Sequence, residues 1–229
     1  MKKSNLWQGY TRTSHYAWCL SNLAFFLFLG CFTGGLILSR GISYAAKEWI
    51  SYTTKDGLAS NVVKCVAVDG DEVWIGTDMG VSRFNKKKSS WTTYNTNTGL
   101  SSNLVKAILV DKNGIWFGTD AGVTLFDKER NTWTSYTTRE GLINDKVKAL
   151  AATDSDVWVG TEGGLSAFSN RTHTLTSYTT ENGLFDNRIR AIVVDGGRLL
   201  VATVGSTLSV LDLGRKEWAF YSPEELIYT

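Results

Sequence analysis

Apolar and polar positions alternate in short runs from residue 61 to residue 96, with turn residues between the runs. The runs at 62–68, 73–77, 81–84 and 90–94 are rich in β-branched and aromatic residues, and Gly, Asn, Asp and Lys separate them. Runs of this length and composition, bounded by turn chemistry, predict four short β-strands. No window carries an apolar stripe at helical spacing, which excludes a helical repeat.

The same pattern recurs along the chain with a fixed step of 42 residues. The motif Trp-Ile-Gly-Thr at 74–77 returns as Trp-Phe-Gly-Thr at 116–119, as Trp-Val-Gly-Thr at 158–161 and, altered, as Leu-Val-Ala-Thr at 200–203. Gly-Leu pairs at 57, 99, 141 and 183 keep the same step. Four short strands in a unit of about 40 residues are typical of a β-propeller blade. The sequence therefore predicts an all-β fold, with four four-stranded propeller blades in residues 46–229.

The repeated tryptophans are predicted to form the core of this fold. Trp74, Trp116 and Trp158 are expected to fill the space between neighbouring blades, because a buried Trp removes ~150–250 Å² from water. The glycine two residues after each Trp is expected to permit close approach of the next blade.

The number of predicted strands leaves two forms of closure open. Residues 49–53 form a surplus strand of the fourth type, and this strand competes with residues 218–221 for the outer place in the last blade. Propellers hide their sheet edges by such closure. We expect either a closed small ring or an open arc that dimerises through its exposed sheet edges.

Several repeated residues together resemble a known family. Gly57-Leu58, Asn61, Trp74-Ile75-Gly76-Thr77, Gly80-Val81 and Phe84 look like the two-component regulator propeller repeat, and the likeness covers about residues 49–221. The resemblance implies a β-propeller with a sensing or binding role outside the cytoplasm of a bacterial cell. Two departures are visible: the fourth repeat lacks the Trp-Ile-Gly-Thr motif, and no kinase, receiver or DNA-binding segment follows the repeats within the 229 residues.

Charge and cysteine content narrow the possible functions. The net charge is +2, and residues 1–45 hold four basic residues and no acidic one, so the repeats are close to neutral and give no electrostatic case for nucleic acid. Cys65 is the single cysteine of the repeats and lies in an apolar run, so we expect a buried, inert thiol. His173 is the single histidine there, which argues against a catalytic triad or a histidine metal site. We expect no enzymatic activity, no cofactor and no metal.

The first 45 residues predict export from the cytoplasm. Residues 17–38 contain no charge and are long enough to span a bilayer, which takes about 20 residues. The segment 1–45 is interpreted as a signal peptide, with a cleavage site at Ser43-Tyr44-Ala45, or as an N-terminal hydrophobic helix that anchors the chain in the membrane. Both interpretations place the repeats outside the cytoplasm, as a periplasmic, secreted or membrane-anchored module.

One periodic set of charges suggests a ligand site. First strands of propeller blades line the central channel, and each predicted first strand here carries a basic residue early in the strand. The turns after the second strands carry acids, and Asn or Asp precedes each basic residue by three positions. We therefore predict a channel-side site for an anionic or carbohydrate ligand, made of Lys64, Lys106, Lys148, Arg190, Asn61, Asn103, Asn187, Asp78, Asp120, Glu162 and, at the rim, Phe185. The alternative is that these charges are solvated or paired with one another.

Three functions follow from these observations. The first is an extracytoplasmic binding or sensing module, linked to two-component signalling through a sensor kinase or another extracytoplasmic partner protein. The second is a structural scaffold for protein interactions. The third, a propeller-type lyase or hydrolase, needs acids, histidine or a metal converging on the channel mouth, and it ranks last because such residues are scarce.

Overall fold

The protein is described by a computed structural model that covers residues 50–205 and 207–221. The predicted signal peptide or membrane anchor, residues 1–45, lies outside the described residues. Within those ranges, no helix has the length and apolar character needed to cross a membrane. One helical turn is present, the 3-10 helix η1 (Thr138–Glu140) in the loop between the second and third sheets.

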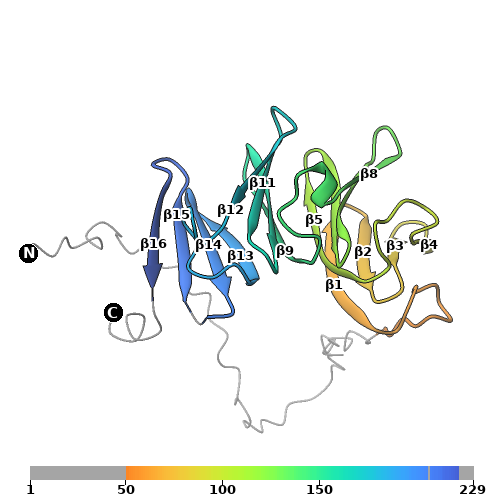
Figure 1. Cartoon of the computed structure of the whole chain (residues 1–229). Coiled ribbons are helices and arrows are strands. Elements are labelled where there is room, and N and C mark those ends of the chain that lie inside the picture. Colours follow the sequence, from red (N-terminus) through yellow and green to blue (C-terminus); the bar gives the residue numbers. More distant parts are fainter. Residues whose placement is uncertain (1–49, 206, 222–229) are drawn as a thin grey trace, which may run out of the picture. The chain divides into compact units, whose positions relative to one another are not determined.

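The repeats fold into four antiparallel sheets of four strands, as predicted (Figure 1). In each sheet the strands pair in sequence order, so each repeat is one blade. The blades are β1 (Val63–Asp69), β2 (Glu72–Thr77), β3 (Val81–Asn85) and β4 (Ser90–Tyr94); β5 (Val105–Asp111), β6 (Gly114–Thr119), β7 (Gly122–Asp127) and β8 (Thr132–Tyr136); β9 (Val147–Ala152), β10 (Asp156–Thr161), β11 (Leu165–Ser169) and β12 (Leu175–Tyr178); and β13 (Ile189–Asp195), β14 (Arg198–Thr203), β15 (Leu208–Asp212) and β16 (Glu217–Tyr221).

The threonine of the repeated motif closes the turn between the second and third strands. The Thr77 hydroxyl donates to the Gly80 carbonyl at 2.8 Å, and the same bond recurs from Thr119 to Gly122 at 2.8 Å and from Thr161 to Gly164 at 2.7 Å. Gly80, Gly122 and Gly164 have φ between 109° and 139°, a region that glycine adopts without steric cost. The motif therefore ends each second strand at a defined residue.

Each repeated tryptophan is buried between its own blade and the next one. We call the blade side that carries this residue the forward face, and the side that meets the preceding blade the rear face. Trp74, Trp116 and Trp158 are at most 1% exposed, and each belongs to an apolar cluster shared with the rear face of the following blade. Trp74, for example, packs on Phe117 and Phe126 with ring centroids 5.6 and 5.7 Å apart. The predicted tryptophan core is confirmed.

The motif glycines lie where the next blade approaches most closely. A Cβ atom added to Gly118 would lie 2.6 Å from Val147 Cγ1, and one added to Gly160 would lie 2.6 Å from Ile189 Cγ2. Carbon atoms in contact prefer about 3.5–4.0 Å, so a side chain at either position would push the blades apart.

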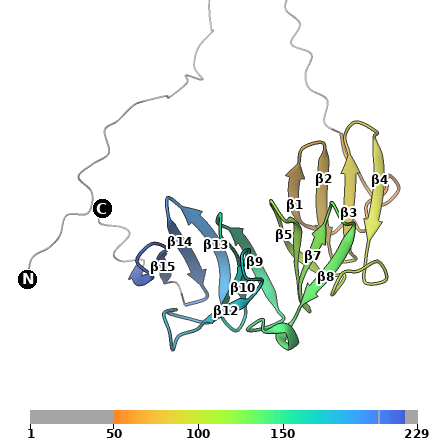
Figure 2. The same cartoon turned by 90° about the horizontal axis from the view of Figure 1, so that it is seen from above.

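The four blades form an open row instead of a closed ring. Both views show the sheets following one another in chain order (Figure 1, Figure 2), and their first strands are neighbours in the pairs β1–β5, β5–β9 and β9–β13. Three apolar clusters join consecutive blades, and among the described residues no cluster joins the fourth blade to the first. Of the two competing strands, 217–221 takes the outer place in the last blade as β16, whereas residues 50–53 form no strand.

Candidate functional site

The predicted basic residues lie near the beginning of each first strand, next to the turns that follow the second strands. Lys148 on β9 and Glu162 in the β10–β11 turn confirm that both elements open at the same end of the blade. Their Nζ and Oε1 atoms are 2.7 Å apart, and Lys146 approaches the other carboxylate oxygen at 3.5 Å. The hydrogen bond from Lys148 is the main cause of a lowered pKa at Glu162, which keeps this carboxylate ionised.

Lys106 on β5 extends this charged surface to the second blade. Partial burial lowers the pKa of Lys106, and the nearby positive charge of Lys148 lowers it further, whereas Asp120 and Glu162 act in the opposite direction. The structure therefore brings Lys106, Lys148, Asp120 and Glu162 within electrostatic reach of one another.

A groove of about 460 Å³ lies between β9 and β13, at the end of the blades that carries the β10–β11 and β14–β15 turns. We call it the basic groove, and its lining residues are Lys148, Glu162, Arg188, Ile189, Arg190 and Val204. Three cationic side chains face one carboxylate, so this lining carries a positive excess. Arg190 is exposed and makes no ion pair with any described residue. Its guanidinium can offer planar, paired donors to a carboxylate or sulfate group.

Two basic residues of this region were missed from the sequence. Lys146 and Arg188 stand two positions before Lys148 and Arg190, and they are 42 residues apart. Lys146 completes the pairing of Glu162, and Arg188 lines the basic groove while forming an ion pair with Asp186 at 2.8 Å. The available signal was a second basic residue two positions ahead of the first, just before β9 and β13, in two successive repeats.

The repeated Asn and Asp residues have a structural role in every blade. The Oδ1 atoms of Asn61, Asn103, Asp145 and Asn187 accept hydrogen bonds from backbone amides seven residues earlier, at 2.7–2.9 Å. The donors are Thr54, Thr96, Thr138 and Thr180. This bond closes the loop that leads into each first strand, and it accounts for the 42-residue period of these side chains without a ligand.

The remaining predicted residues surround the basic groove at greater distance or belong to other blades. Phe185 is 53% exposed, with its ring against Phe220 at 5.9 Å, and it lies next to Gly205, the residue that follows Val204. Lys64 and Asp78 belong to the first blade and do not line the groove. The structure thus places Lys148, Glu162 and Arg190 in the groove, with Lys106 and Asp120 within electrostatic reach of Lys148 and Glu162.

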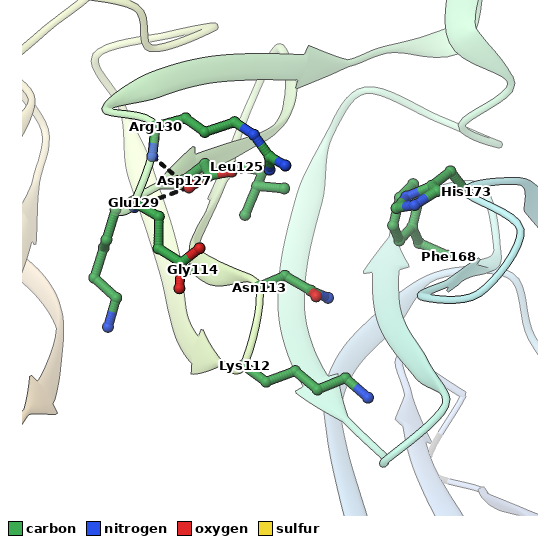
Figure 3. Close-up of a pocket in the computed structure, with 10 residues that line it drawn as sticks. Lys112, Asn113, Gly114, Leu125, Asp127, Glu129, Arg130, Phe168 and His173 are labelled. Atoms are coloured by element: carbon green, nitrogen blue, oxygen red, sulfur yellow. Dashed lines mark hydrogen bonds and ion pairs between the residues drawn. The ribbon is translucent and has the colours of Figure 1, made fainter.

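A second pocket, of about 350 Å³, lies between the second and third blades at the end that carries the β5–β6 and β7–β8 turns (Figure 3). Its lining includes Lys112, Asn113, Asp127, Arg130 and His173. Asp127 Oδ1 accepts from the amides of Glu129 and Arg130 at 2.9 Å, and Oδ2 accepts from the Arg130 side chain at 2.8 Å. Because these bonds hold the β7–β8 turn, the Asp127 carboxylate is occupied by its own turn.

The fold and the groove define a β-propeller-type repeat protein. Its basic groove lies where the first strands of the third and fourth blades begin. Residues 99–121 match the two component regulator propeller family. The resemblance seen in the repeated residues is thereby confirmed, and residues 99–121 carry a two component regulator propeller repeat. No curated protein matches the chain. In the described ranges, no group of three or more His, Cys, Asp and Glu residues is arranged to hold a metal ion.

Solved structures support the fold. The extracellular domain of a putative one component system from B. thetaiotaomicron is similar with a TM-score of 0.63 and 19% identity, over 72% of this chain and 26% of that chain. The computationally designed Ika4 protein is similar with a TM-score of 0.53 and 15% identity, over 67% of this chain and 92% of that chain. Virginiamycin B lyase from Staphylococcus aureus is similar with a TM-score of 0.56 and 14% identity, over 70% of this chain and 55% of that chain. The present chain spans about a quarter of the extracellular domain that it matches.

Proposed function

We propose that this protein is a non-catalytic sensing module outside the cytoplasm, which binds an anionic ligand in the basic groove. The observation that supports this proposal most directly is the unpaired Arg190 beside Lys148 and Arg188 in one groove. The groove volume of about 460 Å³ falls in the range of about 300–1,000 Å³ that is usual for small-molecule sites.

The groove chemistry favours an anionic oligosaccharide or another ligand that carries carboxylate or sulfate groups. Arg and Lys supply charged donors, and bonds to such donors are about twice as strong as neutral ones. Val204, which is 37% exposed, offers a small apolar contact. Phe185 beside the β14–β15 turn provides an aromatic ring against which a sugar ring could stack.

The location and output of the module rest on the family likeness. The two component regulator propeller match and the extracellular origin of a similar solved domain support a place outside the cytoplasm. Residues 17–38, if retained, anchor the module in the membrane, and a sensor kinase or another extracytoplasmic protein reads its ligand-bound state. In the scaffold alternative, the propeller edges bind a protein partner directly.

A lyase function is less well supported, although one similar fold is that of virginiamycin B lyase. Acid–base catalysis needs a side chain that is free to exchange a proton with the substrate. The lining of the basic groove holds no histidine, and Glu162, its one carboxylate, is held by Lys148. The groove is therefore suited to binding an anion and poorly suited to abstracting a proton.

The test is the affinity of the full chain for defined anionic oligosaccharides, measured by calorimetry for the wild type and for Lys148→Ala with Arg190→Ala. Each lost charged hydrogen bond costs about 1.5 kcal/mol or more, so we expect affinity about 100-fold lower and weaker binding as salt rises. The matched control, Lys87→Ala with Lys88→Ala in the β3–β4 turn, removes the same charge at the other end of a blade. Equal losses of affinity in both variants would show that the effect comes from net charge alone and would contradict a specific site in the groove.

A further inference from the structure

The rear face of the first blade has the composition of an interface, but no other blade covers it among the described residues. In blades two to four, the residues that begin the rear face, Val105, Val147 and Ile189, are at most 2% exposed because the preceding blade covers them. Val63 holds the matching place on β1 and is 44% exposed, and Val66 and Val68 on the same face are 57% and 59% exposed.

The forward face of the fourth blade is open in the same way. Val193 and Tyr221 are 57% and 40% exposed, whereas the residues at the matching places on the third blade, Ala151 and Tyr178, belong to or pack against the cluster shared with the fourth blade. Leu200 stands where the earlier blades carry the tryptophan. Among the described residues, one end of the row is therefore a rear face without a blade before it, and the other is a forward face without a blade after it.

We propose that two copies of this chain close head to tail, each fourth blade packing on the partner's first blade, into one ring of eight blades. The two free faces are expected to be complementary because every blade is built from the same repeat. The sheet positions that meet at each of the three internal interfaces also occur on these two faces. A ring of eight blades lies within the usual range of about 4–8, whereas three copies would exceed it. Two copies also satisfy closed two-fold symmetry.

The internal interfaces identify the contacts expected at the closing one. Gly76, Gly118 and Gly160 each face the first rear-face residue of the next blade, so Ala202 is expected to face Val63 of the partner. The extra methyl group of Ala202 is offset by Leu200, which is smaller than the tryptophan that it replaces.

An aromatic contact on the first blade shows what its rear face accepts. Tyr94 at the end of β4 packs on Phe126 and Trp133 of the next blade, with centroids 6.1 and 5.1 Å apart. Tyr52 packs in the same way on Phe84 and Trp91, at 5.4 and 5.3 Å. Tyr52 thus occupies the place of a fourth-strand tyrosine from a preceding blade. Since residues 50–53 form no strand while β16 pairs with β15, Tyr221 of the partner displaces Tyr52.

Surface charges are also matched across the proposed interface. Lys128 of the second blade pairs with Asp69 of the first at 2.6 Å. The repeat places Lys86 and Asp195 at the corresponding positions of the closing interface. The Asp195 side chain is 65% exposed and, among the described residues, forms an ion pair with Arg198 alone, at 3.5 Å, and Lys86 is exposed.

Cysteine cross-linking between differently tagged full chains tests the proposal. One chain carries Val63→Cys and the other carries Ala202→Cys, and the mixture is purified in mild detergent and oxidised. We expect a covalent dimer of one chain of each kind, with a disulfide joining positions 63 and 202 in its peptide map. The control mixture replaces Val63→Cys by Met79→Cys, an apolar position that is 64% exposed outside this face, and each single variant controls for the native cysteines.

Three outcomes overturn the proposal. No linked product means that the faces do not meet. A disulfide within one chain, in the variant that carries both substitutions, means that four blades close on themselves. Products longer than two chains in that variant mean an open array instead of a ring.

A second measurement does not depend on cysteine chemistry. In the full chain, Val66→Lys with Val68→Glu keeps the net charge and alters side chains that are exposed in the single chain, so we expect an unchanged fold by circular dichroism. The dimer dissociation constant, measured by sedimentation, is expected to rise at least 10-fold. A wild-type chain that stays monomeric at all concentrations, or a variant that dimerises equally well, contradicts the proposal.

Discussion

The first strands of the first and second blades, β1 and β5, have closely similar sequences but different environments. Val105 at the start of β5 is completely buried, whereas Val63 at the start of β1 is 44% exposed. The cause lies outside the strand, since β5 packs on the cluster around Trp74, whereas no preceding blade packs on β1 in the part of the chain that the structure describes. Burial in this protein is therefore a property of neighbouring blades, as expected where each repeat contacts only its neighbours.

The forward faces of the second and fourth blades also differ in burial according to whether another blade covers them. Trp116 is completely buried, while Leu200 at the matching place of the last blade is only partly buried. A side chain that no following blade covers can shrink without leaving a cavity. The altered motif at 200–203 thus coincides with the last described blade, where no following blade constrains the side chain among the described residues.

The largest expected effect concerns these two positions. Trp116→Ala leaves a cavity between the second and third blades and is expected to lower the free energy of unfolding by about 3–5 kcal/mol. Leu200→Ala is expected to cost less than about 2 kcal/mol, because its side chain is partly exposed in the single chain. Urea denaturation of the full chain at a concentration too low for association measures both. Equal losses at the two positions would show that the fourth blade is covered.

A smaller effect on stability is expected at the motif glycines, which lie where two blades approach each other. Gly118→Ala places a Cβ atom 2.6 Å from Val147 Cγ1 and is expected to destabilise the protein by about 1–3 kcal/mol. Gly214→Ala, in the exposed β15–β16 turn with no atom closer than 3.4 Å to the added Cβ, is the control and should stay close to wild type. A neutral Gly118→Ala, measured by thermal unfolding, would show that the blades can separate slightly without loss.

Much of the fold could be predicted because its determinants are periodic. The tryptophan motif, the Gly-Leu pairs and the turn residues repeat every 42 residues, so the four strands of each blade and the inter-blade core follow from the sequence. The open row could not be selected over a ring, because the same repeated faces suit both forms. Residues 50–53 were predicted as a strand, but no unpaired sheet edge receives them in the single chain, and only Tyr52 marks the expected place.

The candidate site was predictable only in part. The periodic Lys and Arg residues pointed to one end of the blades, and the structure groups Lys106, Lys148 and Arg190 there. The periodic Asn residues looked equally suitable as ligand donors, yet their oxygens close the inter-blade loops. Periodicity alone cannot separate these cases, because a structural hydrogen bond and a binding residue both recur once in each blade.

The smallest expected effect compares Cys65 on β1 with Ala107, which holds the same place on β5. Burial raises the pKa of Cys65 to about 11, from an ordinary value of 9.0. The folded state therefore favours the neutral thiol, and this contribution to stability is complete below about pH 9 and is lost as the pH rises through 11. Cys65→Ala copies the residue of the second repeat and removes this pH dependence.

The measurement is the difference in unfolding free energy between wild type and Cys65→Ala, followed from pH 8 to pH 11. Because lysines and tyrosines titrate in both proteins, only the difference reports on the thiol. We expect the wild type to lose stability relative to the variant above about pH 9. Mass mapping after iodoacetamide treatment at pH 8.5 provides an independent check, since thiolate is the reactive form. Parallel stability curves, together with rapid alkylation of Cys65 in the native chain, would show that the first blade leaves this thiol in contact with water.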